Sequence, residues 1–341
     1  MKPTDFSKYL TDYLTRYLPV ECGVSRNTIQ TYSLTFTVFL RYMKEEECIK
    51  PERLCMEDIT KKRVIDFLNW LERERKCGVS TRNARLATLH SFFRYIQYRD
   101  ISGLNRWQEI LSVRFKKTAS LEMSFLTAEG MKLVLQQPDT SNPNGRRDLA
   151  LLGLLYDSAA RVQELIDMTP SDFRFDETVT VVLRGKGQKA RVVPLSSNQV
   201  KNLKQYMKER NLFEVCNRTL PLFANPQRNK LSRMAVLNII KKYTDMAKQK
   251  MPEEIPMKIS CHSFRHSKAM HMLEADINLV YIRDFLGHSS TTTTEIYAKA
   301  SAKKKMEALQ KVNPTIVTNK KTTWQKDGEL LSWLKELQQK Y

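Results

Sequence analysis

The chain has 341 residues, 41% of them hydrophobic, and its 57 lysines and arginines against 37 acidic residues give a net charge of +20. This length accommodates two domains with separate cores, and the composition excludes a disordered or fibrous protein. So large a positive charge favours a polyanionic partner, nucleic acid first, although some basic proteins bind none.

The six cysteines contain no C-x-x-C pair, and the N-terminal segment has a charge every few residues with no apolar stretch. The cysteine spacing predicts neither a zinc ribbon nor a disulfide framework, and it favours a reducing compartment. The N-terminal pattern argues against a signal peptide, and no apolar run approaches the ~20 residues of a membrane span. We therefore expect a cytoplasmic protein without membrane association.

The first 115 residues have the apolar periodicity of packed helices. Ser25, Thr60 and Ser80 stand where three helices are expected to begin, each followed by apolar residues at steps of three and four. Residues 1–115 are therefore expected to form a helical domain. The apolar faces contain Ile29, Tyr32, Phe36, Phe39, Leu40 and Met43, then Val64, Phe67, Leu68 and Leu71, then Leu86, Leu89, Phe93 and Ile96.

Basic side chains mark the other side of the third helix and the segment that follows it. Arg82, Arg85 and Arg94 are candidate contacts to DNA phosphates, although a solvated face explains them equally well. Residues 116–124 are polar and break the periodicity, which is typical of an interdomain linker. The linker begins with Lys116 and Lys117, which are further candidates for DNA contact.

Residues 125–313 are expected to form a second domain, mainly α with a small antiparallel sheet. Thr127 begins a helix, and residues 148–159 are apolar on nearly all sides, which predicts a central buried helix. Two branched-chain stretches, 178–184 and 190–195, flank a glycine-containing basic turn and predict a hairpin. Further helices are expected near 198–210, 232–248, 263–275 and 280–286, and Asn313-Pro314 ends the compact part.

Six residues suited to phosphodiester chemistry follow one another in this domain, namely Arg161, Lys186, His262, Arg265, His288 and Tyr297. Guanidinium groups bind two phosphate oxygens and stay charged. A tyrosine attacks phosphorus only if neighbours stabilise its phenolate or accept its proton, because its free pKa is about 10. A lysine or histidine can protonate the leaving oxygen. The set therefore indicates cleavage of a DNA phosphodiester without a metal.

The local pattern favours a shared site. Helical spacing places Glu164 one turn after Arg161. The step of three places His262 and Arg265 on one side of a helix start, where backbone N–H groups attract phosphate. Lys186 lies at the tip of the predicted hairpin, where a basic side chain can reach DNA.

Simpler explanations exist for single members of the set. His262 and His266 have helical spacing for zinc, but no further ligand pair accompanies them, so we expect no metal and no other cofactor. His266 and His271 are expected to pack against other helices or to face DNA. Tyr297 taken alone is better explained as a structural tyrosine, as most tyrosines are, and only the assembled set favours catalysis. Lys186 has an alternative explanation as a solvated turn residue, but a catalytic role is favoured.

Four strings carry a family pattern, namely RVQEL (161–165), GKGQKARVVPL (185–195), HSFRHS (262–267) and LGHSSTTTTEIY (286–297). With this ordered set, residues 125–300 resemble the tyrosine recombinase (phage integrase-like) family. The N-terminal helices resemble the SAM-like core-binding domain of that family. The phrases SAARVQEL, CHSFRHSKAMHML and NLVYIRDFLGH are most similar to its transposase A branch.

The resemblance implies that Tyr297 is the nucleophile and forms a 3′-phosphotyrosyl bond. It implies that Arg161 and Arg265 hold the non-bridging phosphate oxygens. One departure is visible before the first arginine, where Ser158-Ala159-Ala160 replaces the Thr-Gly-hydrophobic sequence that is more frequent in the family. The missing glycine is expected to tighten that turn without removing a functional group.

The remaining roles that the resemblance implies concern proton transfer and orientation. Lys186 would protonate the leaving 5′-oxygen, with Lys189 as the alternative on the same hairpin tip. His262 and His288 would bind the phosphate or assist proton transfer. Glu164 would orient the surrounding network.

The resemblance further implies a site-specific recombinase or transposase that integrates or excises a mobile element by DNA strand exchange. The two domains would close around double-stranded DNA as a C-shaped clamp. Four protomers would join two DNA sites, with accessory recombination proteins as possible partners. Two alternatives stay open, a type IB topoisomerase-like relaxing enzyme and a non-catalytic DNA-binding regulator with the same fold.

Residues 314–341 form a polar tail that ends in an amphipathic stripe of Leu330, Trp333, Leu334 and Leu337. The stripe is too apolar to remain in water, so it either folds back on its own domain or docks on a neighbouring protomer. Terminal helices are exchanged between protomers in the family that the chain resembles. We therefore expect the stripe to be an oligomer contact.

Overall fold

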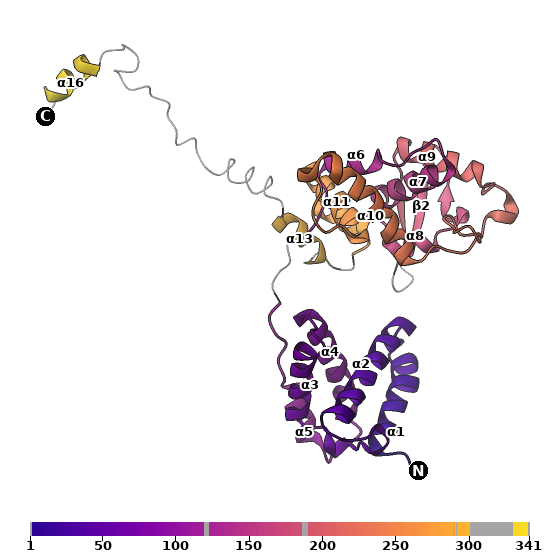
Figure 1. Cartoon of the computed structure of the whole chain (residues 1–341), viewed down its shortest axis with the longest axis vertical. Coiled ribbons are helices and arrows are strands. Elements are labelled where there is room, and N and C mark those ends of the chain that lie inside the picture. The colour runs from indigo at the N-terminus through magenta and orange to yellow at the C-terminus, as the bar shows by residue number, and fades with distance from the viewer. Residues whose placement is uncertain are drawn as a thin grey trace. The chain divides into compact units, whose positions relative to one another are not determined.

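Helices and one small sheet are arranged in two units, Met1–Leu121 and Glu122–Tyr341 (Figure 1). The computed structural model describes residues 2–118, 123–185, 190–288, 290, 292–300 and 330–339. Lys186, Lys189 and Asn313-Pro314 lie outside the described residues, as do residues 119–122 of the predicted linker.

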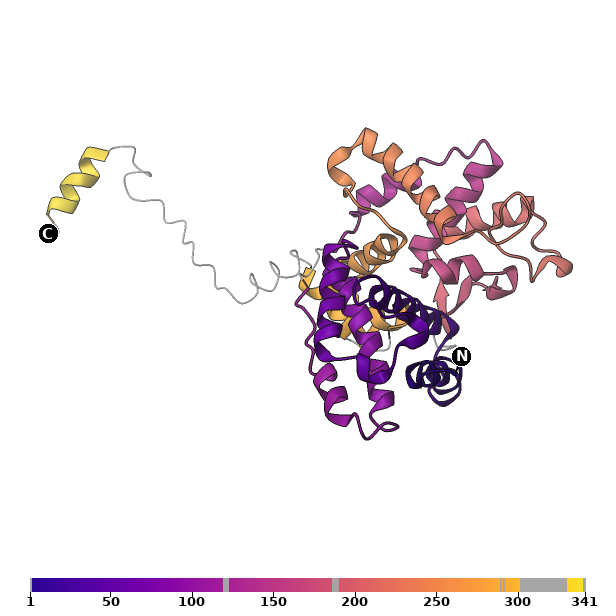
Figure 2. The same ribbon diagram turned by 60° about the horizontal axis from the view of Figure 1, so that its bottom comes forward.

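The first unit is a helical bundle with an aromatic core (Figures 1 and 2). The buried rings of Tyr13, Phe36 and Phe92 lie edge to face with centroids 5.1–6.3 Å apart, an arrangement that adds to the free energy of burial. The elements are α1 (Asp5–Asp12), the π-helix η1 (Tyr13–Glu21), α2 (Arg26–Glu45), η2 (Pro51–Arg53), η3 (Met56–Asp58), α3 (Lys61–Arg73), α4 (Val79–Ile96) and α5 (Leu104–Leu111).

The three helices predicted here are confirmed, with one correction at a cap. The Thr60 hydroxyl caps α3 by accepting a hydrogen bond from the Arg63 backbone N–H. The prediction for Ser80 is wrong, because Gly78 takes the extended cap conformation and Ser80 already lies in the first turn of α4. The helices α1, η1 and α5 were not predicted. Helices of eight or nine residues are marginal alone and depend on tertiary packing, which leaves a weak local signal.

The three arginines of α4 do not share an exposed face, which corrects the sequence prediction. Arg94 is exposed and Arg85 is half-buried, but Arg82 is only 5% exposed. Its Nη1 donates to Asn83 Oδ1 at 3.0 Å and to the Arg114 carbonyl at 3.3 Å. Arg82 therefore faces the segment that leaves the bundle, because this segment folds back along α4 and covers it.

The second unit is built around α7, which packs against α6, α9 and α11 (Figure 1). The prediction of a central buried helix is confirmed, and the Thr127 hydroxyl caps α6 by accepting from the Gly130 N–H at 3.0 Å. The helices are α6 (Ala128–Leu135), α7 (Pro143–Asp157), α8 (Val162–Asp167), α9 (Ser197–Glu209), α10 (Arg233–Lys250), α11 (Cys261–Glu274), α12 (Leu279–Leu286) and α13 (Thr292–Ala300), with 3₁₀ turns at Pro170–Asp172, Val215–Asn217 and Pro252–Glu254.

The predicted hairpin is confirmed as two strands of an antiparallel sheet. β2 (Thr180–Arg184) pairs with β3 (Ala190–Pro194), with Val181 opposite Val193. A short strand that was not predicted, β1 (Phe173–Arg174), adds to the free edge of β2 and gives the order β1-β2-β3. The expected class, mainly α with a small antiparallel sheet, is confirmed.

The tail contains α16 (Leu330–Gln338), which confirms the predicted helix there. Leu334 is 46% exposed and Leu337 is 37% exposed, while Trp333 is half-buried. The side chain of Leu330 lies outside the described part. Across the described ranges, every helix is too short or too polar to cross a membrane.

Candidate active site

The turn between α7 and α8 places the first arginine of the ordered set. Arg161 is the N-cap of α8, and Glu164 at the third helical position accepts its backbone N–H at 2.8 Å. The same carboxylate accepts Arg161 Nη1 at 2.8 Å. This reciprocal cap fixes both side chains by contacts between residues only three positions apart. The Arg161 side chain remains one-third exposed.

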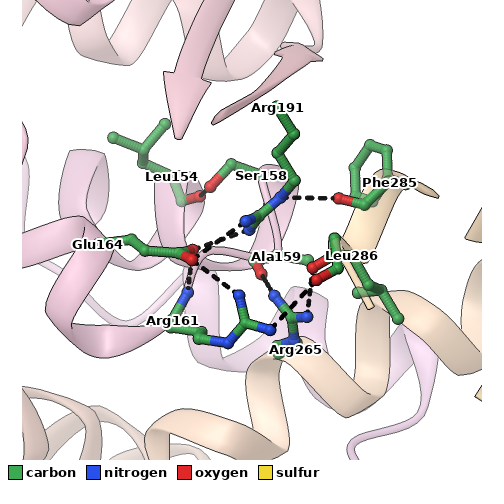
Figure 3. Close-up of polar contacts among 10 residues, drawn as sticks. Leu154, Ser158, Ala159, Arg161, Glu164, Arg191, Arg265, Phe285 and Leu286 are labelled. Carbon is green, nitrogen blue, oxygen red and sulfur yellow. Dashed lines mark hydrogen bonds and ion pairs between the residues drawn. The ribbon is translucent and has the colours of Figure 1, made fainter. Parts of the chain in front are cut away.

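A second arginine, Arg191 of β3, binds the same carboxylate and was missed by the sequence reasoning (Figure 3). Its Nη1 and Nη2 donate to the two Glu164 oxygens at 3.0 and 2.8 Å, and its Nε donates to the Phe285 carbonyl at 3.0 Å. The sequence pattern that could have identified it is the alternation of side chains along the strand. Arg191 is two and four residues from the buried Val193 and Leu195, so it lies on the inward side of the strand. Arg191 thus joins β3, α8 and the end of α12.

Glu164 remains an anion in this setting. Burial by itself raises its pKa, but hydrogen bonds and charge from Arg191 and Arg161 outweigh burial and bring the pKa below its ordinary value. The carboxylate therefore orients both guanidinium groups.

Arg265 of α11 is buried, with 3% exposure, and its acceptors among the described residues are neutral. Its Nη1 binds the Ala159 carbonyl at 2.7 Å, and its Nη2 binds the Leu286 carbonyl (Figure 3). Burial, with the nearby charges of Arg161 and Arg191, lowers the pKa of Arg265 to about 9, so it stays protonated at neutral pH. Three guanidiniums thus lie near one carboxylate, which binds two of them, and the excess positive charge favours an anion.

The backbone supports this arrangement at two left-handed residues. Ala159 has φ +47° and is fully buried, and its carbonyl is the one that holds Arg265. Gly287 ends α12 at φ +63°, a conformation that suits glycine. A side chain at Gly287 would also meet Arg191, whose Cδ would lie 3.0 Å from its Cβ.

The histidines of the second unit have two kinds of surroundings: His271 lies among structural contacts, and the others lie near the arginines of the site. His271 is structural, since its Nδ1 lies 2.8 Å from the Tyr156 hydroxyl and its Nε2 lies 2.9 Å from the Leu126 carbonyl. His262 is exposed at the start of α11, within 6.2 Å of the His266 ring centroid. His288 follows Gly287, and its Nδ1 is 3.0 Å from the Thr294 hydroxyl.

Tyr297 on α13 completes the site. Its side chain is 1% exposed, and its hydroxyl lies 3.1 Å from His266 Nδ1. The His288 ring lies nearly parallel to the phenol ring, at 6.5 Å between centroids. Burial raises the pKa of Tyr297, and the charges of Arg265 and Arg161 act against that rise. His266, predicted to pack against other helices or to face DNA, therefore packs against α13, and its contact with the expected nucleophile was not predicted.

The structure thus brings together five of the six ordered residues, while Lys186 and its alternative Lys189 lie outside the described residues. Within the described ranges, no cluster of three or more histidine, cysteine or acidic side chains is placed to hold a metal ion. The cationic groups and the buried phenol instead suit transfer of a phosphate ester to an oxygen nucleophile.

Comparison with known proteins also indicates an enzyme of DNA strand exchange. Residues 124–304 match the phage integrase family, and residues 11–99 match the phage integrase N-terminal SAM-like domain. The tyrosine recombinase XerA of Pyrococcus horikoshii is 31% identical over 310 residues, covering 89% of this chain and 93% of that protein. The tyrosine recombinase XerC of Syntrophus aciditrophicus is 28% identical over 306 residues, with 88% and 95% covered.

Two solved structures share the fold. The XerH site-specific recombinase bound to a palindromic difH substrate has a TM-score of 0.65 at 20% identity, with 85% of this chain and 81% of that chain covered. The Tn1549 transposon integrase bound to transposon right-end DNA has a TM-score of 0.65 at 16% identity, with 89% and 99% covered.

Proposed function

The chain belongs to the phage integrase family and is a tyrosine-type site-specific recombinase that binds, cuts and rejoins DNA, and we propose that it does so to integrate or excise a mobile element. The support for a mobile element is the similarity of residues 158–165, 261–273 and 278–288 to the transposase A branch. The curated relatives named for this chain are Xer recombinases, so membership of the transposase A branch is a proposal.

We propose that Arg161 and Arg265 bind the non-bridging oxygens of the scissile phosphate. The observation that carries this assignment is that Arg265 is buried and, in the part of the chain that the structure describes, is bonded to carbonyls and to no carboxylate. A guanidinium bonded in this way keeps its full charge for a ligand. Tyr297 attacks the phosphorus, the Tyr297–phosphorus bond forms, and the bond to the 5′-oxygen breaks. The 3′-phosphotyrosyl bond conserves the energy for religation.

The other predicted residues complete this proposal. Lys186, or Lys189, protonates the departing 5′-oxygen, and His262 and His288 bind the phosphate. In the first unit Arg94, Lys116 and Lys117 are exposed and remain candidate DNA contacts, whereas the burial of Arg82 argues against direct contact. We further propose that the two units clamp duplex DNA and that four protomers join two sites.

The test is covalent capture on nicked suicide substrates that carry candidate element ends. The wild-type chain is expected to accumulate a protein–DNA adduct with the nucleotide on Tyr297, located by mass spectrometry. Tyr297→Phe is expected to bind the same DNA and form no adduct. Tyr281→Phe, at a 71% exposed tyrosine of α12, is the matched control. A nucleotide on another residue would refute the assignment.

A second assay separates the proposed function from DNA relaxation. A recombinase joins two sites to each other, whereas a type IB topoisomerase-like enzyme relaxes a supercoiled plasmid that has no partner site. Recombinant products from a two-site plasmid support the proposal. Relaxation with no recombinant products, at any pair of element ends that gives an adduct, would favour the alternative.

A further inference from the structure

The hydroxyl of Tyr297 has a partner whose chemistry is not used above. His266 Nδ1 lies 3.1 Å from the phenol oxygen, and the two rings lie 5.7 Å apart at 56°. Both side chains are held by packed helices, His266 by α11 and Tyr297 by α13, which contact each other. The contact therefore joins two well-placed groups.

The other charged or titratable groups of the site are less favourably placed to accept the phenol proton. Arg265 and Arg161 carry protons already, and Glu164 is bonded to Arg161 and Arg191. His288 directs its Nδ1 to Thr294 and lies with its ring parallel to the phenol ring. His262 lies one helical turn before His266, with its ring centroid 6.2 Å from that of His266. Only His266 directs a ring nitrogen at the hydroxyl among the residues that the structure describes.

The surroundings also keep His266 neutral. Burial first, and then the neighbouring His262 and Arg265, lower the pKa of His266 to about 4. A neutral imidazole has one nitrogen lone pair to offer. In the tautomer with hydrogen on Nε2, that lone pair is on Nδ1 and points toward the Tyr297 hydroxyl.

We propose that His266 is the general base that accepts the Tyr297 proton during DNA cleavage, an inference that rests on the proposed function. As the phenol oxygen bonds to phosphorus, its proton passes to His266 Nδ1. The bond from phosphorus to the 5′-oxygen breaks, and that oxygen takes a proton from the lysine acid. Religation reverses each transfer, so the imidazolium returns its proton to the phenol oxygen.

The test compares two suicide substrates in single-turnover cleavage by the full chain. One has the ordinary 5′-oxygen at the scissile phosphate and the other has a bridging sulfur there, which leaves without protonation. The variant His266→Asn keeps a hydrogen-bonding atom near the Nδ1 position but cannot take a proton. His271→Asn is the control for helix damage, because His271 lies on the same helix and its two ring nitrogens both have hydrogen-bond partners.

His266→Asn is expected to slow cleavage about 10²- to 10⁴-fold on both substrates with unchanged DNA affinity, because the defect lies at the nucleophile. The cleavage rate of His266→Asn should rise with pH, because hydroxide then takes the phenol proton in place of the imidazole. Added imidazole should partly restore the cleavage rate of a second variant, His266→Ala. His271→Asn should lower stability, because it removes partly buried hydrogen bonds, but it should keep the wild-type pH profile.

Three results would overturn the inference. Rescue of His266→Asn by the bridging sulfur would place the defect at the leaving group. Equal or faster cleavage would make the contact a restraint on Tyr297 or a packing contact. A loss that follows DNA affinity would make His266 a binding residue. Absence of any wild-type adduct would instead refute the proposed function itself.

Discussion

Ala159 occupies a backbone conformation that favours glycine, and this gives a prediction with a matched control. The residue has φ +47°, is fully buried, and presents its carbonyl to Arg265 at 2.7 Å. A side chain in the left-handed region costs about 1–2 kcal/mol. The following residue, Ala160, is equally buried but does not have a positive φ.

The two alanine-to-glycine changes should therefore differ. Each removes a buried methyl, at about 0.8 kcal/mol, and each adds backbone freedom to the unfolded chain, at about 0.5–1 kcal/mol. In Ala159→Gly the relief of strain offsets these losses, so stability should stay within about 0.5 kcal/mol of wild type. Ala160→Gly has no such relief and should lose about 1.5 kcal/mol.

Native-state hydrogen exchange of α7 and α8 in the full chain measures these differences within the second unit alone. Cleavage by Ala159→Gly should match wild type, because the carbonyl that holds Arg265 is unchanged. If Ala159→Gly proved as destabilised as Ala160→Gly, the left-handed residue would store no strain and the reasoning would be wrong.

Three further predictions test the site and the tail. Arg191→Lys loses the paired contact with Glu164 and should slow cleavage about 100-fold in single-turnover assays. Arg174→Lys, at an exposed residue of β1, is the control and should cleave at the wild-type rate. If the two variants cleaved at equal rates, Arg191 would have no positioning role. Stability of the second unit should fall as the pH drops from about 6.5 to about 4, because the unfolded chain takes up protons that His266 and His288, each with a pKa of about 4, do not. Urea midpoints across that range check this, and His266→Asn should flatten the curve. Deletion of residues 320–341 should leave cleavage by single protomers intact but weaken joining of two DNA sites in native gels; unchanged tetramer assembly would contradict exchange of the tail helix.

Helical periodicity and the order of the reactive residues could be predicted from the sequence because both are local. A helix such as α3 displays its buried residues every three or four positions, and its cap, Thr60, lies next to it. Arg161 and Glu164 are likewise three residues apart, so their pairing follows from helix geometry. The β2–β3 hairpin follows from two branched-chain stretches and a short turn.

Contacts between distant segments were decided only by the tertiary structure. Arg191 reaches Glu164 across 27 positions, and His266 reaches Tyr297 across 31. Arg82 has the spacing of an exposed residue, yet the segment at Arg114 covers it. The sequence by itself determined which chemical groups the chain has and which local elements carry them. Only packing decided which groups meet, because the distance between two side chains depends on how separate helices and strands come together.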